Sequence, residues 1–99
     1  MTYANPIQRQ ELIAGLRALA DFLEVNPEVP APPFTSILVF PPHADDSQNR
    51  QEIDTIASRI KSGTEISPTH RHYMTSRRFS AIEYRAVAIP ADATKEPGE

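Results

Sequence analysis

The stretch NPIQRQELIAGLRALADFLEVNP, residues 5–27, contains the clearest secondary-structure signal in the chain. Asn5 suits the N-cap position, Pro6 suits the first position of a helix, and Gln8 can complete a capping box. Leucines then recur at intervals of four and three residues, so they lie along one side of a helix. We therefore predict an amphipathic helix from residue 6 to residue 24 or 25 whose leucines pack into the core. These leucines are Leu12, Leu16, Leu19 and Leu23.

A proline-rich connector follows the predicted helix. Four prolines lie within residues 27–33, which keeps the backbone extended and prevents a helix. Two overlapping PxxP spacings in this segment match the ligands of proline-binding domains. Connectors of this composition are far commoner inside domains, so we interpret the segment as a stiff link between the helix and the rest of the chain.

Short apolar segments after the connector are typical of strands. Residues 36–40 form a continuous apolar run that is too short for a helix and ends at two prolines. Asp45, Asp46 or Ser47 can cap a second helix, for which Gly63 supplies the C-terminal stop. The narrow apolar stripe of this helix consists of Ile53, Ile56, Ala57 and Ile60. The remaining segments have the residue types and patterns of strands. They are Thr64–Ser67, His70–Phe79 and Ala81–Ile89.

The order of these elements predicts an α+β fold with the order α-β-α-β-β-β. We expect two layers, in which two helices pack on one face of a mostly antiparallel three- or four-stranded sheet. One hydrophobic core fits a chain of 99 residues, so we expect a single domain over residues 1–90. Residues 91–99 are small, charged and contain a proline, which predicts a flexible C-terminal tail.

The composition excludes several classes of function. The absence of cysteine rules out disulfides, thiolate metal sites and cysteine nucleophiles, and is usual in the cytoplasm. The three glycines, at positions 15, 63 and 98, cannot form a phosphate-binding loop or a dinucleotide fingerprint. No apolar run has the length of a membrane span, and the first residues lack the features of a signal peptide. We therefore expect a cytoplasmic binding protein rather than an enzyme, with no cofactor and no membrane partner.

A basic and aromatic segment lies between residues 70 and 85. The whole chain has a net charge of −3, yet this segment holds four arginines and one acidic residue. Alternation along a strand would place arginines and aromatic rings on one face, where they could stack on a single-stranded nucleic acid. In an alternative interpretation Tyr73 and Phe79 point into the core beneath the helices and the arginines lie at the sheet margins, or the arginines form surface pairs with Glu65 and Glu83. The candidate binding residues are Arg71, Tyr73, Arg77, Arg78, Phe79, Tyr84 and Arg85.

His70 and His72 are the candidate metal ligands. On a strand, alternate residues point to the same side, so the two imidazoles could share a metal ion. A third ligand could come from His43, Asp45 or Asp46. Histidine pairs in polar stretches are usually solvated, so a metal-dependent enzyme is the third of our hypotheses.

Two regions of the sequence resemble small uncharacterised proteins of actinobacteria and their phages. The matching stretches are residues 11–24 with the Asn-Pro and Val-Pro pairs at 26–27 and 29–30, then residues 77–79 and 83–90. The resemblance extends over most of residues 11–90. It implies a bacterial cytoplasmic or mobile-element setting and brings no catalytic residues.

The leading hypothesis is a small cytoplasmic binding or regulatory module that acts through protein–protein contacts or as a homodimer. Strands rich in tyrosine, phenylalanine, methionine and arginine have the composition of interface centres. The residues that motivate this hypothesis are Tyr73, Met74, Arg78, Phe79 and Tyr84. The alternatives are a single-stranded nucleic-acid binder that uses residues 70–85 and a metal-dependent enzyme. A small-molecule ligand is not indicated by any motif.

Overall fold

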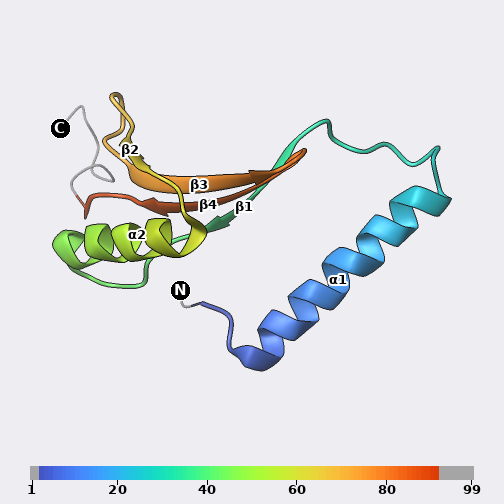
Figure 1. Ribbon diagram of the computed structural model, residues 1–99, viewed down its shortest axis with the longest axis horizontal. Coiled ribbons are helices and arrows are strands. Elements are labelled where there is room, and N and C mark those ends of the chain that lie inside the picture. Colours follow the sequence, from blue (N-terminus) through green and yellow to red (C-terminus); the bar gives the residue numbers. More distant parts are fainter. Residues whose placement is uncertain (1–2, 92–99) are drawn as a thin grey trace. The chain divides into compact units, whose positions relative to one another are not determined.

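Residues 3–91, which the computed structural model describes, form two helices and four strands, as the predicted α+β class and element order require (Figure 1). The elements are α1 (Pro6–Val25), β1 (Thr35–Val39), α2 (Asp46–Ile60), β2 (Thr64–Ile66), β3 (Tyr73–Phe79) and β4 (Ile82–Ala88). Apart from Ala91, the predicted tail lies outside the described residues. In the described part of the chain, neither helix is long and apolar enough to cross a membrane.

The chain divides into two compact units, and the first, residues 3–33, consists of α1 and the connector. The helix starts as predicted: Gln8 N–H donates to Asn5 Oδ1 at 2.7 Å, and Asn5 N–H donates to Gln8 Oε1 at 3.0 Å. At the other end, the backbone and side-chain N–H groups of Asn26 both donate to the Phe22 carbonyl. The helix therefore ends just before the first proline of the connector, where proline restricts the preceding residue.

The sequence predicts that the leucines of α1 pack into a core, but no element of its own unit covers them. No residue of α1 is buried, and the exposed fraction is 38% at Leu16 and 53% at Leu19. The physical reason lies in the composition of the unit, which contains one helix and an extended connector. A single helix without a second element cannot cover its own apolar side.

The second unit, which begins at Phe34, is built on a four-stranded sheet in the order β1-β4-β3-β2. β1 runs parallel to β4, and the other two neighbouring pairs are antiparallel. The sheet is therefore mixed, with a majority of antiparallel pairings. The parallel pairing aligns Thr35 with Ile82 and Val39 with Ala86, so it joins segments that are distant in the sequence.

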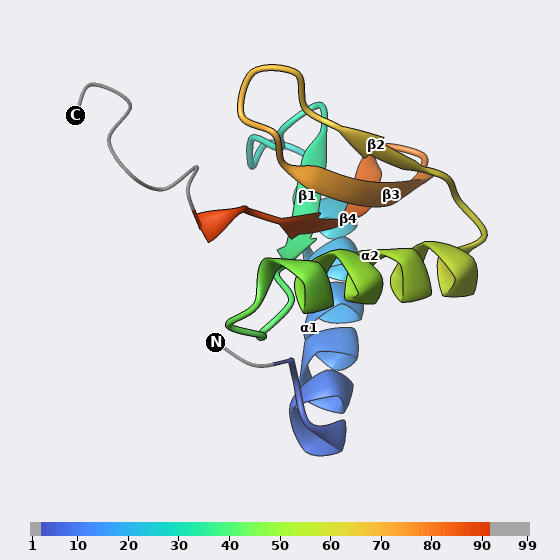
Figure 2. The same cartoon turned by 90° about the vertical axis from the view of Figure 1, so that its left-hand side faces the viewer.

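α2 packs on one face of this sheet, alongside β3 and β4 (Figures 1 and 2). Ile53 on α2 is 0% exposed and packs with Ala86 and Ala88 of β4. Ala57, one turn further along the helix, is also buried. Four partly buried side chains complete this core: Val39, Ile56, Tyr73 and Tyr84. The predicted stripe of the second helix therefore supplies the centre of the core.

The C-terminal end of α2 is made by a lysine and not by the predicted glycine. Lys61 is the C-cap and adopts the left-handed conformation, with φ of 57°. The next backbone N–H, on Ser62, donates to the Ala57 carbonyl at 2.9 Å, as in a Schellman turn. Gly63 has no positive φ and follows the turn. Glycine is favoured but not required at this position, so the sequence pattern placed the stop two residues late.

β3 is shorter than predicted because a turn replaces its first three residues. Ser67 begins this turn: its carbonyl accepts from Arg71 N–H at 2.8 Å and its hydroxyl from His70 N–H at 3.2 Å. Arg71 has φ of 58°, a left-handed conformation that strands do not contain. The strand therefore begins at Tyr73, and His70, Arg71 and His72 precede it.

Candidate interaction surfaces

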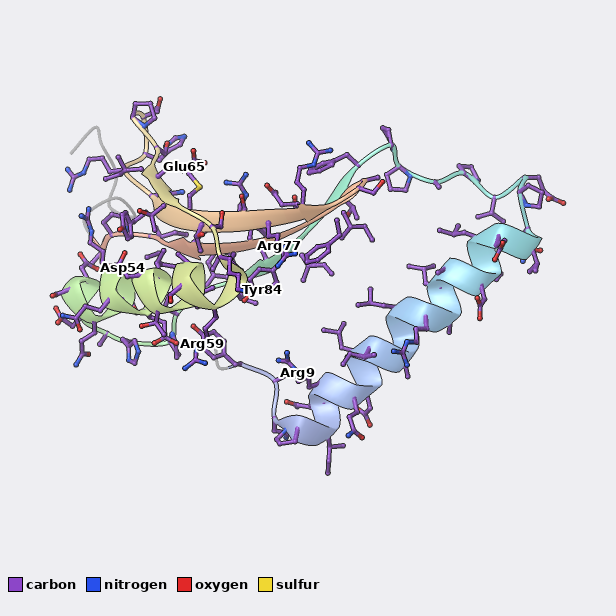
Figure 3. All side chains as sticks on the ribbon, in the orientation of Figure 1. Arg9, Asp54, Arg59, Glu65, Arg77 and Tyr84 are labelled. Carbon is purple, nitrogen blue, oxygen red and sulfur yellow. The ribbon has the colours of Figure 1, made fainter. Side chains whose placement is uncertain are left out.

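The predicted binding residues lie on both faces of the sheet. Tyr73 and Tyr84 belong to the core beneath α2, and Arg77 is paired in register with Tyr84, so it shares that face (Figure 3). Alternation places Arg78 and Arg85 on the opposite face. The structure therefore does not gather the arginines of residues 70–85 on one surface.

Tyr73 is held against α2 by its hydroxyl group and its ring. The hydroxyl donates to Asp54 Oδ1 at 2.5 Å and lies 3.1 Å from Thr64 Oγ1. The Arg50 guanidinium lies 5.3 Å from the ring centroid, within the range of a cation–π contact. The position of Tyr73 agrees with the alternative interpretation of the sequence, in which its ring packs beneath a helix.

Two arginine–aromatic pairs lie near the β3–β4 turn. The Arg77 guanidinium is 5.1 Å from the centroid of Phe79, and the Arg78 guanidinium is 4.7 Å from that of Phe34. Arg78 Nε also donates to the Ser80 carbonyl at 3.3 Å. Phe79 is 57% exposed, so the pair formed by Arg77 and Phe79 is accessible to a ligand. Because Arg77 and Arg78 are adjacent on one strand, the two pairs point to opposite faces.

Arg85 forms a bidentate ion pair with Glu83 on the face opposite α2. Its Nε donates to Glu83 Oε1 at 3.0 Å and its NH2 group to Oε2 at 2.9 Å. The Ser36 hydroxyl donates to the same carboxylate at 2.9 Å, and Glu83 is only 6% exposed. Hydrogen bonds from Arg85 lower the pKa of Glu83, and the carboxylate in turn raises the pKa of Arg85. The charge of Arg85 is therefore already neutralised by a neighbour.

His70 and His72 lie close together, but the residues around them do not complete a metal site. Their ring centroids are 5.4 Å apart, with the planes inclined at 32°. His43 lies elsewhere, where its backbone bonds to Asn49 and its Nε2 is 3.7 Å from Glu52 Oε1. Within residues 3–91, no group of three or more His, Cys, Asp or Glu side chains could hold a metal ion.

The surface that the sequence analysis did not select is the apolar side of α1. We call it the α1 stripe and define it as Leu12, Ile13, Leu16, Leu19, Phe22 and Leu23. The first five of these are each more than one third exposed, and Leu23 is half-buried. The signal was present in the leucine spacing, but the same spacing is typical of a helix that packs into a core. Exposed patches of this kind mark interaction sites more often than isolated exposed leucines do.

Comparisons with known proteins give no family for this chain. No protein-family model matches it, and neither a curated protein nor a solved structure is significantly similar. The resemblance to small actinobacterial and phage proteins therefore stays a prediction, and the function is inferred from the surfaces described above.

Proposed function

We propose that this protein is a cytoplasmic binding module that acts through contacts with other protein chains, of its own kind or another. The observation that supports the proposal is the exposed α1 stripe, because a helix with no buried residue has its apolar side available to a partner. The cysteine-free sequence supports a reducing compartment.

The free energy available from the α1 stripe is large enough for specific binding. Complete burial of one leucine or phenylalanine side chain stabilises by about 1.5 to 3 kcal/mol. Leu12, Leu19 and Phe22 are each about half exposed, so each still has a part of that amount to gain. A partner that covers the stripe would recover several of these contributions together, less the entropy lost on association.

Leu19→Gln and Ile7→Gln form a matched pair of variants that tests this function. Both substitutions remove an exposed apolar side chain and keep a good helix former, but only Leu19 belongs to the α1 stripe. We expect L19Q to weaken association at least tenfold in light scattering or in affinity capture, and I7Q to leave it unchanged. Equal effects of the two variants would contradict the proposal.

Single-stranded nucleic acid is the second candidate ligand, and the arginine–aromatic pair of Arg77 and Phe79 favours it. Arginine over an exposed ring offers a base both a stacking surface and a positive charge. The test is a salt series with labelled oligonucleotides, in which phosphate contacts produce a steep loss of affinity. R77Q should abolish that binding, and R59Q on α2 serves as the charge-matched control. Weak binding that does not change with salt would reject this candidate.

A further inference from the structure

The leucines of the α1 stripe follow the spacing of a coiled-coil seam. Leu12, Leu16, Leu19 and Leu23 are separated by four, three and four residues, so they alternate between the d and a positions of a heptad. Where two such helices lie antiparallel, each a residue faces a d residue. Leu12 then meets the partner's Leu23, and Leu16 meets the partner's Leu19. The relation is reciprocal, so the two chains make four leucine–leucine layers.

The flanks of the seam are also complementary in size. In this antiparallel register Phe22 lies beside the partner's Gly15, and Ile13 lies beside the partner's Ala20. Each large flanking side chain therefore faces a small one. A Cβ built on Gly15 would have no heavy atom within 4 Å, so the space above this glycine is open.

The charges at the two ends of α1 favour an antiparallel partner. The helix has no acidic residue in its first turn and no basic residue in its last, so its own charges do not complement its dipole. Arg9 lies near the positive N-terminal end, and Glu24 lies near the negative C-terminal end. In an antiparallel pair, Arg9 lies beside the C-terminal end of the other helix, where a cation is stabilised. A parallel pair would instead place Arg9, which is at an a position of the heptad, beside the partner's Arg9.

We infer that the occupant of the α1 stripe is a second copy of this chain, whose own α1 packs against it antiparallel with Leu16 facing the partner's Leu19. This inference rests on the proposed function and names its partner. An anionic membrane surface fits less well, because α1 carries three acidic residues and two arginines and so would be repelled.

The test is a charge exchange across the central layer, followed by sedimentation or light scattering of the full chain. A pairing of one 20-residue helix per chain is a small interface, so the concentration series extends into the millimolar range. We expect the unaltered chain to form a dimer, and L16E and L19K each to weaken it at least tenfold. Mixing L16E with L19K should restore a heterodimer, because Glu at 16 of one chain then faces Lys at 19 of the other.

L16E mixed with L16K is the orientation control. Recovery in this mixture would indicate that the helices lie parallel and would overturn the inference, whereas failure to recover supports it. Circular dichroism and thermal melting of each variant show whether the sheet unit remains folded. A dimer that persists in both single variants would overturn the inference alone, since a different surface would then mediate association. The proposed function would also be overturned if the unaltered chain is a strict monomer and L16E melts at a lower temperature than it does. Such a result would mean that the α1 stripe is covered within one chain.

Discussion

The Glu83–Arg85 pair shows how a carboxylate can be buried on the sheet face opposite α2 when a partly buried arginine binds it. The two residues are two positions apart on β4, so their side chains point to the same face. Ser36 on β1 adds a third hydrogen bond to the carboxylate, and a hydrogen bond from Ser76 on β3 also lowers the pKa of Glu83. The pair thus ties the three strands together at the side-chain level.

Loss of Arg85 should destabilise the protein, because Glu83 would remain buried with an uncompensated charge. We expect Arg85→Ala to cost about 1.5 to 3 kcal/mol in the free energy of unfolding, the range for hydrogen bonds to charged groups. Urea denaturation followed by circular dichroism measures this change. Arg85→Lys keeps the charge but loses the bidentate geometry, so its cost should be intermediate. A cost below about 0.5 kcal/mol for the alanine variant would show that the pair behaves as an exposed one.

The stability contributed by Glu83 should depend on pH in a defined direction. Its pKa is lower in the folded chain than in the unfolded chain, so the unfolded state takes up the proton first as the pH falls. The contribution is therefore complete above the unfolded pKa of about 4.3 and is lost as the pH falls through the lower folded pKa. Glu83→Gln lacks this titration, so the stability difference between it and the unaltered chain should narrow below about pH 4. A difference that stays constant from pH 7 to pH 3 would contradict this account.

Helices and their ends can be predicted from the sequence where neighbouring residues determine them. The capping box of Asn5 and Gln8, the proline that follows Asn26 and the stripe around Ile53 each specify an element or its end, and the structure has these elements. Lys61 and Arg71 adopt left-handed conformations that lysine and arginine rarely adopt, so the end of α2 and the start of β3 could not be read from the sequence. Tertiary context decides such positions.

Ile53 is the residue through which α2 is held on the sheet, and its truncation gives the clearest test of the core. Ile53→Ala should cost about 2 to 5 kcal/mol in the free energy of unfolding, because the side chain is 0% exposed. Ile7→Ala is the matched control, because the side chain of Ile7 is 71% exposed. Chemical denaturation of both variants measures the free energy of unfolding. The loss in Ile53→Ala beyond that in Ile7→Ala is the part due to the buried cavity.

The C-terminal turn of α2 offers two stabilising substitutions. Lys61→Gly should relieve the left-handed backbone at position 61, with a gain of up to about 1 kcal/mol. Gly63→Ala should gain about 0.4 to 1 kcal/mol, because Gly63 lacks a positive φ and a Cβ there meets nothing within 4 Å. Thermal melting measures both gains, and Lys61→Ala is the control that keeps the strain. Destabilisation by K61G would show that the lysine side chain itself contributes.

For the chain as a whole, local sequence patterns do not show whether another element covers a helix. The periodicity of α1 is the same for a helix in a core and for a helix with an open apolar side. Strand order was likewise beyond local pattern, because the parallel β1–β4 pairing depends on contacts between distant segments. For the candidate site, the alternation along the strand placed Arg77 and Phe79 on one face, but their contact and the faces of Arg78 and Arg85 followed only from the structure.

The two units should respond differently to removal of α1. The sheet unit has its own core around Ile53, Ala86 and Ala88, so a chain that begins at Phe34 should fold and melt cooperatively. Its far-ultraviolet circular dichroism should lose the contribution of the 20 residues of α1 and keep that of the sheet. The shortened chain should also be monomeric at concentrations where the full chain associates. An unfolded fragment would contradict the independence of this core.

The β1–β4 pairing also has a consequence for the order of folding. β3 and β4 are joined by a turn at Ser80 and Ala81, whereas the contact from Ser36 on β1 to Glu83 on β4 spans 47 positions of sequence. Closing so long a loop is slow compared with forming a hairpin. During synthesis, β1 leaves the ribosome well before its only neighbour in the described sheet exists. The apolar residues of β1 therefore remain unpaired until β4 has been synthesised. This makes β1 the strand most prone to misassembly in a newly made chain.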